Sequence, residues 1–366
     1  MSRARTSRWF ALAALAVAPL GCALIAGLED HQLRPAGPVV IADQPGALPH
    51  ALLVDDTTAY WVTEASGRRG IWKVDKRGGT TVQLAVLQDP DAPTPASVEI
   101  GLAMDLEHVY WTQSQVQGNC DPSSPDYAPD RIMGVLKAGG ALGPLVETCP
   151  HWQPHGVAAD GQHVFASWRG NHRIDRIRKG TLSTSPLAEN QYDPTEIVVD
   201  QTHVYWIVRR DDSSEAYIRS VSKNAPSTQP ETLFSADSVA ERRPNAIAVD
   251  DTTLFWVDDG RVRALHKPGT AGQGGGDGGQ DAVDGIRDIA SARGVFPAIA
   301  IDRDHVYWTE ATEGRILRAP KRGVLVEPEV LAEGQSDPEA IAVDDEAIYW
   351  TNFVGGQLVR MNKPRP

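Results

Sequence analysis

The side chains of this chain that could do chemistry are histidines and carboxylates that belong to no familiar catalytic motif. His50, His155 and Glu339 each stand five residues before an aspartate that recurs along the chain, and Asn245 has the same place in another copy. Histidine and carboxylate groups can transfer protons or bind a metal, and they can also simply hydrogen-bond a ligand. Further candidates follow the aromatic residues of the recurring pattern: Trp168, Arg209, Asp258, Glu310 and Asn352.

The recurring aspartate marks a repeat that occurs seven times. An aromatic residue follows it by five positions in every copy, and a tryptophan comes next in six copies, while the third copy has Ala166 there. A second signature places an aliphatic residue five positions before a lysine. The aspartate–aromatic pairs are Asp55–Tyr60, Asp105–Tyr110, Asp160–Phe165, Asp200–Tyr205, Asp250–Phe255, Asp302–Tyr307 and Asp344–Tyr349. The aliphatic–lysine pairs are Ile71–Lys76, Ile132–Lys137, Ile174–Lys179, Ile218–Lys223, Val262–Lys267, Ile316–Lys321 and Leu358–Lys363.

Each copy has the composition of four short strands. In the fifth copy, residues 246–249 are small and β-branched, as in a crowded inner strand, and residues 250–253 form a turn because aspartate favours turns over strands. Residues 254–257 form an aromatic second strand, and a third strand leads to Lys267. The first copy supplies a fourth strand at residues 82–86. Four antiparallel strands in each of seven repeats predict an all-β fold, a seven-bladed β-propeller.

The two ends of the array predict how the ring closes. The seventh copy ends soon after its third strand, and residues 39–44 resemble the last strand of the sixth copy, residues 330–335. We therefore expect the N-terminal strand to complete the last blade, which removes the open sheet edges. The propeller then covers residues 38–366.

The aromatic segments resemble the YWTD repeats of low-density lipoprotein receptor (class B-like) propellers. The resemblance is clearest at residues 306–310 (VYWTE) and 348–352 (IYWTN), and it runs through all seven copies. It implies the propeller fold, with an aspartate at the end of the motif that ties neighbouring blades together. Here that aspartate survives only as Asp258, which indicates a diverged bacterial branch without most of those ties.

The residues present in every blade are expected to be structural. The repeat aspartates and lysines fall in hairpin turns on one face of the ring, where they could pair, an exposed pair contributing about 0–1 kcal/mol. His108, His163, His203 and His305 also share one repeat position, one in each of four blades. Neighbouring blades diverge there beyond the ~2 Å reach of a zinc ligand, so we expect no metal at these histidines.

The residues that differ between blades point instead to the other face, around the mouth of the central channel. The ring of polar positions there is interrupted by Ile100, Thr195 and Pro297, which is too apolar for a strong metal cage. We therefore expect a non-enzymatic binding module without cofactor or metal, contacting an envelope protein, glycan or peptide. The alternative is a propeller lyase or lactonase with a channel metal and His50 or His155 as the acid–base group.

The N-terminus predicts export and lipid anchoring. Arg3, Arg5 and Arg8 precede a twelve-residue apolar stretch, residues 9–20, which is too short to span a bilayer and suits a signal peptide. The stretch ends in Pro-Leu-Gly-Cys, which resembles a bacterial lipobox with Cys22 as the lipidated residue. We expect a signal peptide over residues 1–21, a tether over residues 22–37, and a location in the bacterial cell envelope, on the periplasmic or outer-membrane face. The alternative is an ordinary secretory signal with an incidental cysteine.

The remaining cysteines predict a disulfide, and the net charge excludes one class of partner. With Cys22 lipidated, Cys120 and Cys149 are left as a pair that an oxidising compartment favours as a disulfide, the alternative being two free thiols.

The net charge of −13 and the lack of a basic patch argue against a nucleic-acid partner. We expect a monomer. A glycine-rich stretch at residues 272–281 is expected to be a flexible loop rather than a calcium site.

Overall fold

The computed structural model describes most of the chain from residue 37 onward. The described residues are 37–65, 69–87, 101–114, 119, 121, 123–124, 127, 129–141, 143–149, 151–209, 215–225, 229–236, 243–258, 260–267, 285–291 and 298–364. The predicted signal peptide, Cys22, Cys120 and the glycine-rich stretch lie outside them, so the lipid anchor and the disulfide of Cys149 stay predictions. The described part of the chain holds no helix long and apolar enough to cross a membrane.

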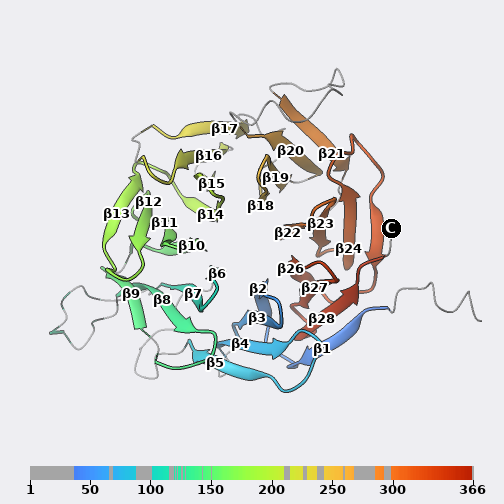
Figure 1. Cartoon of the computed structure of the whole chain (residues 1–366), viewed down its shortest axis with the longest axis horizontal. Helices are drawn as coiled ribbons and strands as arrows, with labels where there is room; N and C mark the ends of the chain where they lie inside the picture. Colours follow the sequence, from blue (N-terminus) through green and yellow to red (C-terminus); the bar gives the residue numbers. More distant parts are fainter. Residues whose placement is uncertain are drawn as a thin grey trace, which may run out of the picture.

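The described residues form seven four-stranded antiparallel sheets, which are the blades of a propeller. Figure 1 shows them as sectors of a ring, with the first strand of each blade at the centre. Blade 1 consists of β2 (Pro49–Val54), β3 (Thr58–Thr63), β4 (Gly70–Asp75) and β5 (Val82–Val86). Blade 2 consists of β6 (Leu102–Met104), β7 (His108–Gln113), β8 (Asp130–Leu136) and β9 (Gly143–Thr148). Blade 3 consists of β10 (Pro154–Ala159), β11 (His163–Trp168), β12 (Arg173–Arg178) and β13 (Thr184–Ala188).

The other blades follow the same plan. Blade 4 consists of β14 (Pro194–Val199), β15 (His203–Arg209), β16 (Ala216–Ser222) and β17 (Glu231–Ala236). Blade 5 consists of β18 (Ala246–Val249), β19 (Thr253–Asp258), β20 (Arg261–His266) and β21 (Ile286–Ser291). Blade 6 consists of β22 (Ile299–Ile301), β23 (His305–Glu310), β24 (Arg315–Pro320) and β25 (Glu329–Ala332). Blade 7 consists of β26 (Pro338–Val343), β27 (Ala347–Asn352), β28 (Gln357–Asn362) and β1 (Val39–Asp43).

The ring closes as the sequence predicts. The N-terminal strand β1 pairs antiparallel with the C-terminal strand β28, with Val39 opposite Arg360 and Asp43 opposite Gln357. Ile41 and Ala42 of β1 then lie in a buried cluster with residues of blade 1, so the strand also contributes to the contact between the last and first blades. The first and last strands that the structure describes are thereby held in one sheet, so all seven blades have four strands.

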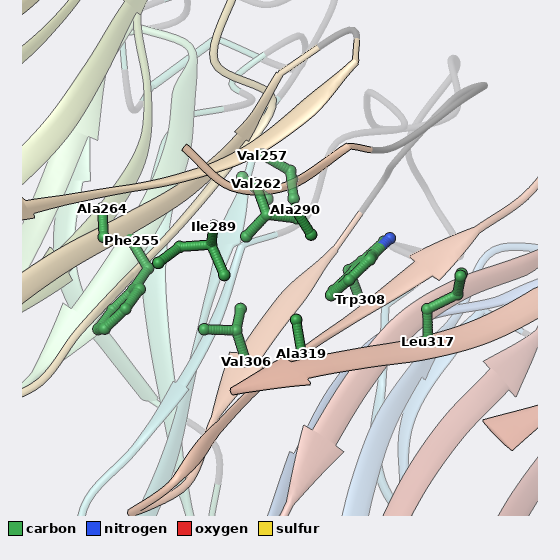
Figure 2. Close-up of a cluster of buried hydrophobic side chains, with 11 residues drawn as sticks. Phe255, Val257, Val262, Ala264, Ile289, Ala290, Val306, Trp308, Leu317 and Ala319 are labelled. Carbon is green, nitrogen blue, oxygen red and sulfur yellow. The ribbon is translucent and has the colours of Figure 1, made fainter. Parts of the chain in front are cut away.

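The core is divided into seven parts, one between each pair of neighbouring blades. Figure 2 shows the part between blades 5 and 6, where Phe255 and Val262 face Val306 and Trp308. The tryptophans of the repeat are all buried at these contacts; in blade 3, where Ala166 stands in the repeat position, Trp168 is fully buried instead. Because a sheet buries apolar side chains on both faces only when another sheet covers each, the fold requires the closed ring.

A closed ring of ion pairs joins the same blades on one face. Each repeat lysine donates a hydrogen bond to the repeat aspartate of the preceding blade, at Nζ–Oδ2 distances of 2.5–2.9 Å. The sequence predicts that aspartates and lysines pair, and the structure adds that every pair crosses between blades. The pairs are Lys76–Asp344, Lys137–Asp55, Lys179–Asp105, Lys223–Asp160, Lys267–Asp200, Lys321–Asp250 and Lys363–Asp302.

Each repeat aspartate also shapes its own turn. The second oxygen of Asp200 accepts the backbone N–H groups of Thr202 and His203, while the oxygen that meets Lys267 also accepts the Tyr205 hydroxyl. Burial alone would raise the pKa of these seven carboxyls, but the hydrogen bonds from the lysine and the N–H groups outweigh burial. The pKa is therefore lowered in every case, to about 2 for Asp302. These carboxylates are therefore held ionised.

The four recurring histidines confirm the structural interpretation. Each ring lies 5.8–6.2 Å from the ring of the repeat aromatic residue in its own blade. They therefore cover the aromatic residues at the turns and do not converge on one another. The contacts are His108–Tyr110, His163–Phe165, His203–Tyr205 and His305–Tyr307.

Candidate functional site

The two faces of the ring are built from different connections. The turn face carries the turns between first and second strands and between third and fourth strands, together with the ion-pair ring. The loop face carries the connections between second and third strands and those that lead from one blade to the next. The predicted site residues His50, His155, Asn245 and Glu339 all lie where the inner strands begin, at the loop-face end of the channel. Inner strands of adjacent blades contact each other all round the ring, so these positions surround one mouth.

His50 is held against its own blade and is largely buried. Its Nε2 atom lies 3.1 Å from Oε1 of Glu64, although the two atoms are not aligned for a hydrogen bond. Burial, with a smaller contribution from the Arg69 guanidinium, lowers the pKa of His50 to about 4, against a backbone hydrogen bond at Leu48 that raises it. The imidazole is therefore neutral at pH 7, and its Nε2 atom faces the largely buried Glu64 carboxyl.

Glu196, which the sequence analysis missed, stands in the inner strand of blade 4. Its Oε2 accepts the backbone N–H of Ile247 in blade 5 at 3.1 Å. Burial raises the pKa of Glu196 to about 7, although that hydrogen bond and the Arg209 guanidinium lower it. The sequence held a signal, because the equivalent residue in every other copy is glycine or alanine: Ala51, Gly101, Gly156, Ala246, Ala298 and Ala340.

The small residues at that position are explained by the close approach of neighbouring inner strands. A Cβ added to Gly101 would lie 2.5 Å from the carbonyl oxygen of His155, and one added to Gly156 would lie 2.5 Å from that of Thr195. Blade 4 accommodates a carboxyl where its neighbours accommodate no more than a methyl group. Glu196 is thus a local departure from the repeat at the channel mouth.

Arg209 and Asn245, both predicted as site residues, meet beside Glu196. The Arg209 guanidinium donates to the carbonyl oxygens of Pro244 and Asn245 at 3.0–3.2 Å, and to Oδ1 of Asn245 at 3.2 Å. The three side chains bridge blades 4 and 5. Arg209 and Asn245 are both half-buried, so their side chains form part of the polar edge of the mouth.

His155 and Glu339 are placed on other sides of the same mouth. Both are half-buried, and burial together with the Asp337 carboxylate raises the pKa of Glu339. Glu339 and His50 occupy the same repeat position on β26 and β2, which are neighbouring inner strands. The titratable groups of the mouth are therefore shifted toward their neutral forms at His50, Glu196 and Glu339.

Four predicted site residues lie inside the protein. Trp168 and Asp258 have no exposed surface, and Glu310 and Asn352 are almost completely buried. Trp168 contacts Trp152 edge-on, Asp258 meets Arg263 at 3.3 Å, and Glu310 pairs with Arg315. The Asn352 amide donates to Gln335. Arg263 and Arg315 lie in third strands, and Trp152 and Gln335 lie in the connections between blades. The four side chains therefore hold their second strands to these neighbours and are not exposed at the mouth.

Within the described part of the chain, no three histidine, cysteine, aspartate or glutamate side chains are grouped so that they could hold a metal ion. Two hollows, of about 1390 Å³ and about 640 Å³, lie on the turn face, where the sequence analysis placed no site. The larger hollow extends over the turns of blades 1, 2 and 3, and the smaller one extends over the turns of blades 3, 4 and 5.

Comparison with known proteins supports the propeller fold and gives no further information. No family model and no curated protein matches the sequence. Virginiamycin B lyase from Staphylococcus aureus is similar in structure, with a TM-score of 0.61 and 14% identity over 89% of this chain and 98% of that one. U3-55K has a TM-score of 0.60 and 12% identity over 90% of this chain and 100% of that one. A chain of the nidogen/laminin complex has a TM-score of 0.47 and 17% identity over 78% of this chain and 98% of that one, too weak a likeness to support an argument.

Proposed function

We propose that this chain is a non-enzymatic binding propeller of the bacterial cell envelope, anchored by lipid on Cys22. Its loop face contacts an envelope protein, glycan or peptide at the mouth of the channel, and it belongs to a diverged branch of the YWTD-type propellers. The observation that carries the proposal is that the side chains at the mouth change from blade to blade. The position of His50 holds Ile100, His155, Thr195, Asn245, Pro297 and Glu339 in the other blades, and Glu196 replaces a glycine or alanine.

The state of these side chains favours recognition over catalysis. Arg209 and Asn245 hold each other and neighbouring carbonyl groups, and His50 is neutral beside Glu64. A half-buried rim of neutral and pre-oriented polar groups suits hydrogen bonding to a ligand, because little is lost in ordering or desolvating such groups.

Site-specific photo-crosslinking in living cells tests the proposal. A photo-reactive amino acid at position 155 faces the mouth, and the matched control at position 201 stands exposed on the turn face of the neighbouring blade. We expect a discrete crosslinked species from position 155 that is absent from position 201 and lost on Glu339→Ala. No crosslinked product from the mouth, or the same products from both positions, would overturn a loop-face site.

Glu196 favours a second candidate, an enzyme of the lyase class. A carboxyl with a pKa of about 7 can exchange a proton at neutral pH, and propellers of similar shape include virginiamycin B lyase. Elemental mass spectrometry of the purified full chain separates the candidates. A stoichiometric metal ion that is lost on Glu339→Ala or His155→Ala would establish the enzyme, whereas we expect no such ion. Incubation with virginiamycin B, followed by mass spectrometry of the antibiotic, is the direct assay.

A further inference from the structure

The larger hollow of the turn face extends over the turns of blades 1, 2 and 3 and is bordered by a residue without a side chain. In blade 1, Lys73 reaches across to the carbonyl oxygen of Lys137 at 2.6 Å, and in blade 3, Arg176 reaches that of Lys223 at 2.6 Å. The equivalent residue of blade 2 is Gly134. The long cation that crosses to the next blade in blades 1 and 3 is therefore absent here. Gly134 lines the hollow together with Tyr110 and Leu145, whose side chains lie close to it.

Two other positions in blade 2 depart from the repeat at the same place. Leu106 stands at the tip of the turn after β6 and is 95% exposed, whereas the other copies have Asp56, Gly161, Gln201, Asp251, Arg303 and Asp345 there. Leu136 precedes the repeat lysine, where no other copy has an aliphatic chain, and it is 43% exposed. Both leucines line the hollow, as does the exposed Leu182 of blade 3. Three substitutions toward small or apolar residues thus converge on one opening.

The exposed leucines belong to a longer series of aliphatic side chains, which we call the apolar arc. It runs from β1 through blade 1 to blades 2 and 3 and consists of Val39, Val40, Val82, Leu106, Leu136 and Leu182, each of them exposed. Val82 starts β5 directly after a turn of the turn face, and Val39 starts β1. Exposed apolar side chains that stand together, as the three leucines do at the hollow, usually mark a surface that another surface covers, whereas single ones are common.

The point where the chain enters the propeller lies at one end of this arc. The described chain starts at residue 37, two residues before Val39, and the predicted tether of residues 22–37 therefore joins the propeller at the turn face. Sixteen residues reach at most about 55 Å when fully extended and are far shorter on average. A lipid on Cys22 would keep the turn face near the bilayer.

We propose that the apolar arc rests on the lipid bilayer and that the larger hollow takes an acyl chain. The inference deepens the proposed function, because it relies on the lipid anchor to bring the arc to the membrane. A flat apolar partner contacts side chains spread over four blades at once, whereas a peptide would need one continuous patch. Of the charged groups that line the hollow, Lys179 pairs with Asp105 and Lys137 pairs with Asp55. Asp56 and Glu107 also line it and are exposed, so their carboxylates would stay in water at the edge of the contact. The loop face then points away from the bilayer.

Fluorescent labelling of the full chain, reconstituted in neutral phosphatidylcholine vesicles, tests the contact. An environment-sensitive dye is attached at Leu106→Cys, and the matched control is Val354→Cys, an aliphatic residue of the loop face that is 65% exposed. Both positions are fully on the surface, so the changes leave the fold intact. We expect blue-shifted emission and several-fold weaker quenching by iodide at position 106, with no change at position 354.

The outcomes separate the arc from the anchor. Equal quenching at both positions, with Cys22 lipidated by intact mass, overturns the arc and leaves the anchor. Protection at position 106 in a chain whose mass shows no lipid retains the arc and overturns the anchor. Protection that is the same without vesicles identifies a second protein surface as the partner and overturns the bilayer contact.

Discussion

The carboxyls of the turn face and the titratable groups of the loop face show how one ring of repeats divides structure from recognition. The seven repeat aspartates each meet a lysine, and the pKa of every one is lowered, so they are held charged. At the channel mouth, burial lowers the pKa of His50 and raises those of Glu196 and Glu339, so these groups are held toward neutrality. The repeated groups join blades, and we propose that the unrepeated ones belong to a ligand site.

The contrast between repeated and unrepeated residues also shows where to look for a binding surface in a repeat protein. A comparison of copies identifies unrepeated residues on either face, and the turn face yields Gly134, Leu106 and Leu136 as readily as the loop face yields Glu196. The loop-face departures are polar and the turn-face departures are apolar. That chemical contrast is the reason why we propose two different partners, a polar ligand and a bilayer.

Acid should have the largest effect on stability, because it protonates the aspartates of the ion-pair ring on the turn face. Each repeat aspartate has a lowered pKa in the folded protein, so its stabilising contribution is complete above the unfolded pKa of about 3.9 and is lost as the pH falls through the folded pKa. For Asp302 the folded pKa is about 2. We expect the melting temperature to fall steeply between about pH 4 and pH 2. A melting temperature that stays flat across that window would show that the pairs do not join the blades in solution.

Removing one lysine at a time tests the ion-pair ring more closely, because some of its lysine–aspartate pairs are more buried than others. Lys267 and Asp200 are each only 7% exposed, whereas the Asp250 partner of Lys321 is 31% exposed. We expect Lys267→Met to lower the free energy of unfolding by about 3 kcal/mol, since it leaves Asp200 buried without its cation. The matched substitution Lys321→Met should lower the free energy of unfolding by only about 1 kcal/mol, since Asp250 is more exposed. Chemical denaturation of both variants measures the difference, and equal losses would contradict the role of burial.

Glu196→Gln tests the loop face with the opposite pH dependence. The pKa of Glu196 is raised to about 7, so its contribution to stability is present below the unfolded pKa of about 4.5 and is lost as the pH rises through 7. The glutamine keeps an oxygen that can accept the Ile247 N–H but carries no charge. We expect the variant to be more stable than the parent at pH 8 by about 2 kcal/mol and equal to it at pH 5. A stability difference that does not vary with pH would show that Glu196 is ionised throughout.

His50→Gln should have the smallest effect of the four, over a pH range that overlaps that of Glu196 but with the opposite sign. The pKa of His50 is lowered to about 4 from an unfolded value of about 6.5, so neutral His50 stabilises the fold above pH 6.5 and that contribution is lost as the pH falls toward 4. Removing the titration should flatten the stability profile between these values by about 1–2 kcal/mol. NMR titration of the imidazole checks the pKa directly, and a value near 6.5 would contradict burial as the controlling factor.

The sequence by itself determined the fold, because a repeat reports the same local geometry seven times. The strands of residues 82–86 and 246–249 and the closure by β1 follow from periodicity, turn residues and the need to remove open edges. It also placed His50, His155, Asn245 and Glu339 at one mouth, since equivalent positions in a ring lie at one level. The buried positions of Asp258 and Glu310 did not follow, because exposure at a strand end depends on the loops that cover it.

Only the tertiary structure decided which partners the repeated and unrepeated residues have. Lys267 and Asp200 are 67 residues apart, and their pairing across blades depends on how far one sheet is rotated against the next, which no local pattern encodes. The same holds for the contact of Glu196 with Ile247 and for the hollow at Gly134, since each is a property of the space between blades. Sequence periodicity specifies the blade, and the packing of one blade on the next specifies the sites.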